Sequence, residues 1–87
     1  ANSGKVYSVS FSPDGKLLTS GHNDGTIKLW NIQGQLLKTF HGHSNYVVRV
    51  LFSPDGKTIA SASHDRTIKL WTIDGHELKT FIGHSAG

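Results

Sequence analysis

The stretch Thr67-Ile68-Lys69-Leu70-Trp71 repeats Thr26-Ile27-Lys28-Leu29-Trp30 residue for residue, 41 positions later in the chain. Ser53-Pro54-Asp55-Gly56-Lys57 repeats Ser12-Pro13-Asp14-Gly15-Lys16 at the same offset of 41. In this register 24 of 41 aligned positions are identical, which chance does not produce. The chain is therefore two copies of one unit, and a fixed period of this length indicates a repeat architecture.

Each unit has the pattern of four short β-strands, and no segment places its apolar residues at helical spacing. The motif Ser53-Pro54-Asp55-Gly56-Lys57 predicts a hairpin turn, because Pro sets the first turn angle and Gly accepts a positive φ. The step of three between Val47 and Val50 breaks strict alternation and predicts a β-bulge. Tight turns at His64-Asp65-Arg66 and at Asp74-Gly75 separate the later strands. We therefore expect an all-β fold of two four-stranded antiparallel meanders.

The composition excludes several classes of protein. The chain has 87 residues, of which 36% are apolar, and no Cys, so a disulfide scaffold and a thiolate zinc site are both excluded. No apolar run approaches the ~20 residues that a membrane helix needs, and 1–5 lacks the apolar segment of a secretory leader. We therefore expect a cytoplasmic protein with no membrane partner. A chain of this size is only marginally stable on its own, which raises the question of whether it holds a complete core.

Residues with a shared spacing point to one family. Gly42-His43 precedes the first strand of the second copy, Trp71 closes its third strand, and Asp65 lies in the turn between its second and third strands. Together with 47–56 (VVRVLFSPDG), and with their counterparts in the first copy, they make the chain resemble the WD-repeat family over essentially its whole length. The residue after each Trp departs from the dipeptide that names the family, at the most tolerant position of the motif.

The resemblance implies a β-propeller in which each unit forms one blade, with its first strand at the central channel and its fourth at the rim. It divides the chain into a polar lead, a first blade, a joint, a second blade and a C-terminal joint, at 1–5, 6–41, 42–46, 47–82 and 83–87 respectively. Because 1–5 aligns with 42–46, the joint region is represented twice.

In such blades a His, a Ser or Thr, an Asp and the Trp form a buried hydrogen-bonded tetrad. The arrangement is physically sensible, because the Asp accepts hydrogen bonds from the His and from turn N–H groups, while the Ser relays to the indole. Carried over residue by residue, the tetrad of the second blade comprises His43, Ser61, Asp65 and Trp71.

The first blade lacks the His of this tetrad, since Asn2 stands at the position that matches His43. The chain ends instead with a spare Gly-His pair that no blade follows. We therefore expect His84 of one chain to complete the first blade of the next, a head-to-tail contact of the kind that closes into rings. The first-blade residues that it would join are Ser20, Asp24 and Trp30.

Two blades alone would leave two of their four faces in water, although strand one carries Val6, Val9 and Phe11. Repeat architectures generally need three or more units for this reason. We therefore predict that copies of the chain assemble into a closed propeller. Two blades per chain permit even blade numbers when every blade is used. Four chains giving eight blades is the preferred ring, and three chains giving six blades is the second choice.

The His, Ser and Asp residues also invite other chemistry. A catalytic triad would need an exposed nucleophile and an oxyanion hole, neither of which is indicated, and the tetrad accounts for the Trp as well. His41 and His43 form the closest pair of metal ligands, but two ligands make a weak site and His43 belongs to the tetrad. His41, His22, His64 and His76 lie near predicted turns and are expected at the surface. We predict no enzymatic activity, no metal and no cofactor.

The charge balance offers a further hypothesis. The net charge is +3 and the pI is near 9.5, so the chain could attract polyanions nonspecifically. Lys16, Lys28 and Lys38 each recur at the matching position of the second copy, which spreads the charge over a solvated rim. No aromatic interleaving or nucleic-acid-binding module accompanies it, so we expect no specific nucleic-acid partner.

The best candidate for a binding surface is the propeller face that carries the joint and the turn before each third strand. In the WD-repeat family this face commonly recruits peptides and other proteins, and Tyr and Arg are favoured anchors. The alternative is that Tyr46 and Arg49 only pack at the rim of the channel. The residues of this candidate face are Asn23, Ser44, Tyr46, Arg49 and His64.

Two descriptions of the whole molecule follow. The first is a non-enzymatic protein-binding module that self-assembles into a propeller. The second is a building block, cut from a longer propeller or engineered, that assembles without a ligand of its own.

Overall fold

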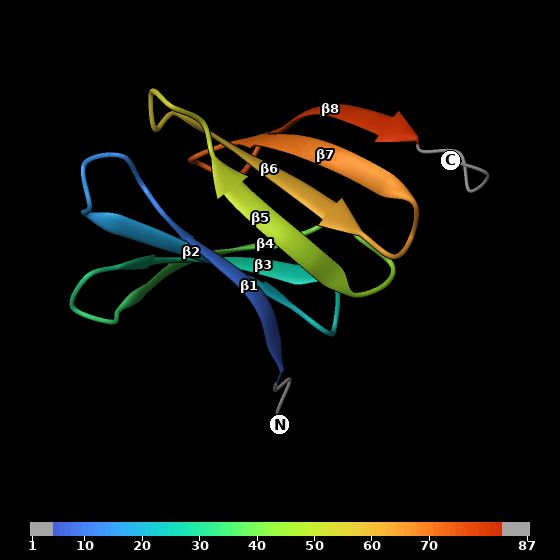
Figure 1. Cartoon of the computed structure of the whole chain (residues 1–87), viewed down its shortest axis with the longest axis horizontal. Coiled ribbons are helices and arrows are strands. Elements are labelled where there is room, and N and C mark those ends of the chain that lie inside the picture. The colour runs from blue at the N-terminus through green and yellow to red at the C-terminus, as the bar shows by residue number, and fades with distance from the viewer. Residues whose placement is uncertain (1–4, 83–87) are drawn as a thin grey trace.

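The structure, a computed structural model, describes residues 5–82. Within this range the chain forms eight strands and no helix, and thus no helix that could cross a membrane. The strands pair in the orders β1-β2-β3-β4 and β5-β6-β7-β8, as two antiparallel four-stranded sheets (Figure 1), which confirms the predicted fold class. The strands are β1 (Val6–Phe11), β2 (Leu17–His22), β3 (Thr26–Asn31), β4 (Leu36–His41), β5 (Val47–Phe52), β6 (Thr58–Ser63), β7 (Thr67–Thr72) and β8 (Glu77–Ile82).

The two Ser-Pro-Asp-Gly-Lys turns adopt the conformation that their residues predict. Gly15 and Gly56 have φ angles of +74° and +72°. The carboxylate of Asp55 accepts a hydrogen bond from the Lys57 backbone N–H (2.9 Å), and the Gly56 N–H donates to the Ser53 carbonyl (2.9 Å). The matching bonds recur in the first copy, so local turn chemistry sets the first hairpin of each sheet.

Each sheet contains bulges. The predicted bulge in β5 is confirmed, because its register with β6 shifts between Val47 and Arg49, and β1 shifts at the matching place. The third and fourth strands of each sheet also shift register at the Trp. The sequence analysis did not foresee these shifts. Their signal is the adjacent Leu-Trp pair, which breaks the alternation of β3 and of β7.

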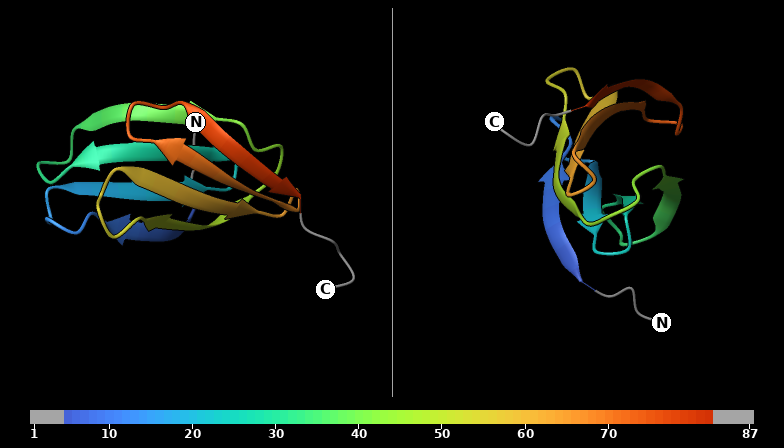
Figure 2. Two further views of the ribbon diagram at one scale, coloured as in Figure 1. Left: turned by 90° about the horizontal axis from the view of Figure 1, so that it is seen from above. Right: turned by 90° about the vertical axis from the view of Figure 1, so that its right-hand side faces the viewer.

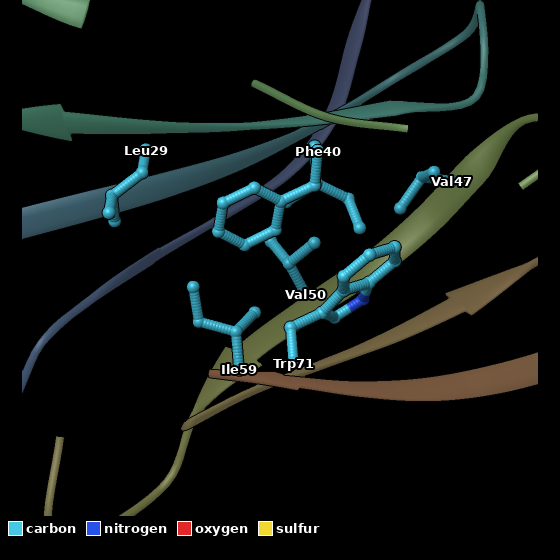
Figure 3. Close-up of a cluster of buried hydrophobic side chains, with 7 residues drawn as sticks. Leu29, Phe40, Val47, Val50, Ile59 and Trp71 are labelled. Carbon is cyan, nitrogen blue, oxygen red and sulfur yellow. The ribbon is translucent and has the colours of Figure 1, made fainter. Parts of the chain in front are cut away.

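One apolar core lies between the two sheets. Within it Phe40 and Trp71 come from different sheets, and their ring centroids are 5.3 Å apart (Figure 3). Gly42 of the joint lies directly against the same indole: a Cβ there would be 2.6 Å from Cη2 of Trp71, so only glycine fits. A fully buried apolar side chain contributes about 1.5–3 kcal/mol, so this core is the main cohesion between the sheets. The core residues, none more than 2% exposed, are Ile27, Leu29, Phe40, Val47, Val50, Ile59 and Trp71.

β1 and β5 run side by side where the sheets meet, and the sheets diverge from there towards β4 and β8 (Figure 2). The Val50 N–H donates to Ser8 Oγ (3.2 Å), and the Phe52 N–H donates to Ser10 Oγ (3.4 Å). These side-chain bonds tie the two first strands together. The sheets are therefore two neighbouring wedges with their first strands at the narrow edge.

Arg66 occupies a conformation that favours glycine. Its φ is +71°, and the matching residue of the first sheet is Gly25, with a φ of +87°. A left-handed backbone costs a residue with a Cβ about 1–2 kcal/mol, while glycine adds disorder to the unfolded chain. We therefore expect Arg66→Gly to raise the free energy of unfolding by about 0.5–1 kcal/mol in a urea titration. Arg49→Gly, in the extended strand β5, is the control and should lower the free energy; a loss of stability in Arg66→Gly would contradict this account.

Candidate functional site

The second sheet brings together four polar residues from the joint, β6, the β6–β7 turn and β7. His43 Nε2 lies 2.7 Å from Ser61 Oγ, and the indole N–H of Trp71 donates to the same oxygen (2.9 Å). His43 Nδ1 lies 2.9 Å from a carboxylate oxygen of Asp65. The bonds are consistent with one proton order: indole to hydroxyl, hydroxyl to Nε2, and Nδ1–H to carboxylate. These are the four residues that the resemblance stated in the sequence analysis implied for this tetrad.

Thr67 is a fifth member, which the sequence analysis missed. Its hydroxyl donates to Asp65 (2.5 Å) and lies 3.1 Å from His43 Nδ1, and its backbone N–H also donates to Asp65 (2.9 Å). The Ser44 backbone N–H adds another bond to the same carboxylate (3.0 Å). The signal was the repeated Asp-x-Thr spacing, because Thr26 donates to Asp24 in the same way.

The tetrad holds the joint in place and does not present a reactive group. Ser61 is 1% exposed, and its oxygen is held by the indole and the imidazole. Within residues 5–82 every buried side-chain nitrogen and oxygen has a hydrogen-bond partner. The network therefore fixes the joint onto the β6–β7 turn and leaves no exposed nucleophile in this cluster.

Asp65 makes this network sensitive to acid. Burial raises the pKa of Asp65, but the hydrogen bonds from Thr67, His43 and Ser44 outweigh it, so the pKa lies well below its usual range. A carboxylate with a lowered folded-state pKa stabilises the fold above its unfolded pKa of ~3.9, and this stabilisation is lost as the pH falls.

We therefore expect Asp65→Asn to be less stable than the wild type at pH 7, with a difference that shrinks as the pH falls from about 5 to 3. Urea titrations at several pH values measure it. Asp14→Asn, at a fully exposed turn, is the control and should cost less at pH 7. A cost of Asp65→Asn that stays constant with pH would argue against the ionised carboxylate as the stabilising form.

The first sheet completes its Ser–Trp pair differently. The indole N–H of Trp30 donates to Ser20 Oγ (2.9 Å), as in the second sheet. The imidazole against Ser20 belongs to His22, whose Nε2 lies 2.7 Å from the oxygen. The prediction that His22 lies at the surface is therefore wrong: it is 6% exposed. His84 and Asn2, which the sequence analysis considered for this place, lie outside the described residues.

The other histidines do not gather into a metal site. His41, His64 and His76 are exposed, as predicted. The carboxylate of Asp24 accepts hydrogen bonds from the backbone N–H and the hydroxyl of Thr26. In the part of the chain that the structure describes, no three His, Asp or Glu side chains are grouped so as to hold a metal ion.

Three aromatic side chains form a row on the face of the joint. The ring centroid of Tyr46 lies 5.5 Å from that of Tyr7 on β1 and 5.5 Å from that of His64 on the β6–β7 turn. We call Tyr7, Tyr46 and His64 the aromatic row. Tyr7 was missed because its counterpart in the second copy is Val48, so the repeat gave no signal for it.

The remaining residues of the candidate face surround this row. Ser44 is exposed beside Tyr46, and Arg49 is exposed on β5 without joining the row. Asn23 lies in the β2–β3 turn, which packs beneath the joint: a Cβ at Gly25 in that turn would be 2.4 Å from the His43 carbonyl. The structure therefore brings Tyr46 and His64 together, while the Ser44 backbone is bonded to Asp65 of the same turn and Asn23 lies on the adjoining turn.

The outer faces of the two sheets form a second candidate surface. Val47 and Val50 are 0% and 1% exposed in the core, whereas their first-copy counterparts Val6 and Val9 are 50% and 55% exposed. We call the outer face of the first sheet, with Val6, Val9, Leu18 and Trp30, the head face.

The outer face of the second sheet shows the converse. Ile27 and Phe40 are 0% and 2% exposed, whereas their counterparts Ile68 and Phe81 are 45% and 46% exposed. We call this surface, with Ile68, Leu70 and Phe81, the tail face. The head face repeats one side of the buried core and the tail face repeats the other side.

Comparison with known proteins identifies the family. The family model described as WD domain, G-beta repeat, matches residues 1–31 and 34–72. The chain belongs to the WD-repeat family, whose members are generally non-enzymatic scaffolds for protein–protein interactions.

Particular relatives share part of the chain. It is 52% identical over 45 residues to the uncharacterized WD repeat-containing protein alr3466 of Nostoc sp. (strain PCC 7120), across 51% of this chain and 3% of that protein. It is 42% identical over 45 residues to WD repeat-containing protein 86 of Homo sapiens, across 51% of this chain and 12% of that protein. The chain spans between 3% and 12% of the length of such curated relatives.

A solved structure gives the same fold. The crystal structure of RRP9 WD40 repeats superposes with a TM-score of 0.91 at 34% identity, and the match covers 98% of this chain and 26% of that one. The two sheets are thus similar to two neighbouring blades of a propeller.

Proposed function

We propose that the chain is a self-assembling protein-interaction module, whose copies join head to tail into a closed propeller that presents the aromatic row. The observation that carries the assembly is the matched exposure of the two copies. Val6, Val9, Ile68 and Phe81 are about half exposed, while their counterparts are buried in the contact between the sheets of one chain. A tail face set on the head face of another copy would reproduce that core.

The ring that we favour has four chains and eight blades, and three chains with six blades is the second choice, because propellers have 4–8 blades and each chain contributes two. In either ring, His84 of one chain would approach Ser20 and Trp30 of the next, as His43 approaches Ser61 within the chain.

The junction between chains would be weaker than the one within a chain. Ser8 and Ser10 accept backbone hydrogen bonds across the internal junction, but their counterparts at the outer junction are Arg49 and Leu51. Leu51 has no hydroxyl, and Arg49 is a donor only, so neither can accept these bonds. The outer junction would therefore depend on its apolar faces, and assembly would depend on concentration.

The mass of the particle tests the assembly. In sedimentation velocity or native mass spectrometry, the preferred ring should have four times the chain mass of 9.5 kDa, and the second choice should have three times that mass. A dilution series at micromolar concentrations and below would show dissociation to single chains. A particle of one chain throughout this range would overturn the assembly.

The aromatic row is the surface that we propose for peptide binding. Tyr7 and Tyr46 are partly exposed, Tyr46 packs at a tilt against both Tyr7 and His64, and the exposed cation Arg66 lies on the same β6–β7 turn as His64. Rigid aromatic side chains with a polar tip are typical anchors for proteins and peptides. The charge of Arg66 favours a peptide with acidic residues.

Peptides selected on the assembled protein from a random display library should depend on this row. We expect Tyr46→Ala to weaken their binding about tenfold or more, measured by isothermal titration calorimetry. Lys57→Ala, at the turn on the opposite end of the second sheet, is the control and should leave binding unchanged. Selected peptides that bind both variants equally would favour the building block without a ligand of its own, and binding that vanishes by ~200 mM salt would favour the nonspecific polyanion hypothesis.

A further inference from the structure

His22 and the joint His occupy the same chemical position in the two copies. In the second sheet, His43 comes from the joint, and the residue that matches His22 is the small Ser63. In the first sheet the position that matches His43 is Asn2, and His22 supplies the imidazole from the end of β2. Each Ser–Trp pair therefore has one imidazole, from the joint in the second sheet and from the end of β2 in the first.

The two networks match in geometry as well as in composition. The Nε2–Oγ distance is 2.7 Å for His22 with Ser20 and 2.7 Å for His43 with Ser61. The indole N–H donates to the Ser oxygen at 2.9 Å in both sheets. The Ser20 oxygen accepts a hydrogen bond from the Trp30 indole N–H, so the consistent arrangement has the Ser20 hydroxyl donating to His22 Nε2. A second imidazole would find this hydroxyl proton already used.

The surroundings of His22 suit a neutral imidazole. Burial lowers the pKa of His22, the Lys28 ammonium lowers it further, and the carboxylate of Asp24 acts in the opposite direction. A lowered pKa favours the neutral imidazole, and in the tautomer with its proton on Nδ1 the Nε2 atom can accept from Ser20.

We propose that His22 is an intramolecular stand-in for the joint His: it completes the Ser20–Trp30 pair in the single chain and competes with His84 of the neighbouring chain for Ser20. This inference rests on the proposed head-to-tail assembly. Because Ser20 already has its imidazole in the single chain, docking of His84 would exchange one hydrogen bond for another and add little. His22 would also have to swing out of its buried position, so it limits the affinity of the junction.

The test replaces His22 with the residue that its own repeat uses at this position. His22→Ser copies Ser63, which the second sheet accommodates, so the variant is expected to fold. We expect it to tighten the junction about three- to tenfold, because docking of His84 then gains a full hydrogen bond. The readout is the dissociation constant of the ring from a sedimentation dilution series. His76→Gln copies Gln35, changes an exposed His and should leave the constant unchanged.

A second pair of variants tests whether the effect of His22→Ser requires His84. In chains that also carry His84→Ala, His22→Ser should no longer tighten the junction. If His22→Ser lowers the dissociation constant equally in the His84→Ala chains, the competition is overturned. It is also overturned if His22→Ser alone leaves that constant unchanged or raises it.

A measurement on single chains separates this inference from the proposed function. NMR titration of the His22 ring in the dilute monomer should give a pKa below the ordinary value of a histidine. An ordinary pKa for His22 would overturn the stand-in even where rings form. Absence of rings in every variant, with a lowered His22 pKa, would overturn the assembly and the competition but uphold the stand-in within the single chain.

Discussion

Val9→Asp and Phe81→Asp should each break the ring. Val9 lies on the head face and Phe81 on the tail face, and their counterparts Val50 and Phe40 are at most 2% exposed in the internal junction. A carboxylate placed in such a contact loses its water without gaining a partner, which costs several kcal/mol. We therefore expect the dissociation constant of the ring to rise more than ~100-fold for either variant, so that sedimentation shows single chains.

A mixture of the two variants gives a sharper result. A Val9→Asp chain retains its tail face, and a Phe81→Asp chain retains its head face, so the pair can form one good junction and no more. We expect the mixture to form a particle with twice the chain mass of 9.5 kDa, although each variant alone is monomeric. This outcome is specific to head-to-tail contact, because an isologous dimer would not require the two different variants.

The matched control uses a residue that is exposed in both copies. Leu37 and its counterpart Leu78 are 50% and 56% exposed, so neither belongs to the internal junction. Leu37→Asp should leave the ring intact. Dissociation of that variant would mean that the rings break through general destabilisation, and persistence of the ring in Phe81→Asp would rule out the tail face as the contact.

Trp71→Ala should cost the single chain about 3–5 kcal/mol, the usual range for a buried Trp. Trp71 is 2% exposed, packs on Phe40 and Gly42, and donates its indole proton to Ser61. The substitution removes the centre of the apolar contact between the two sheets and leaves Ser61 without its donor. Since domains of this size have about 5–15 kcal/mol of stability at most, the variant should be partly unfolded at physiological temperature.

Trp30→Ala is the matched control. Trp30 makes the same bond to Ser20, but its outer side lies on the head face, against which residues 5–82 place no second sheet. In the monomeric Phe81→Asp background, urea unfolding should therefore show a smaller loss for Trp30→Ala than for Trp71→Ala. Equal losses would show that burial between the sheets is not the source of the difference.

The sequence predicted what depends on neighbouring residues along the chain. The two Ser-Pro-Asp-Gly-Lys turns, the four strands of each unit and the bulge after Val47 follow from local backbone preferences and from alternation. The internal repeat then indicated two equal sheets, because identical local chemistry folds in the same way twice.

The sequence predicted that two of the four sheet faces would lack a neighbour, but it did not predict which copy of each repeated residue would be exposed. Val9 and Val50 are the same residue at the same repeat position, yet one is exposed and the other is buried. Likewise, no local signal buries His22 beside Ser20. Only the folded sheet shows that an imidazole two residues along β2 reaches that oxygen.

Sequence alone determined that this protein is a pair of WD-repeat blades with a Ser–Trp pair in each, since turn chemistry, alternation and the repeat are encoded residue by residue. Only the tertiary structure decided that Thr67 joins the tetrad, that Tyr7 extends the aromatic row and that His22 replaces the joint His. Those roles arise from distances between strands that the chain brings together by packing. The contact between Phe40 and Trp71 is part of that packing, because it joins β4 of the first sheet to β7 of the second.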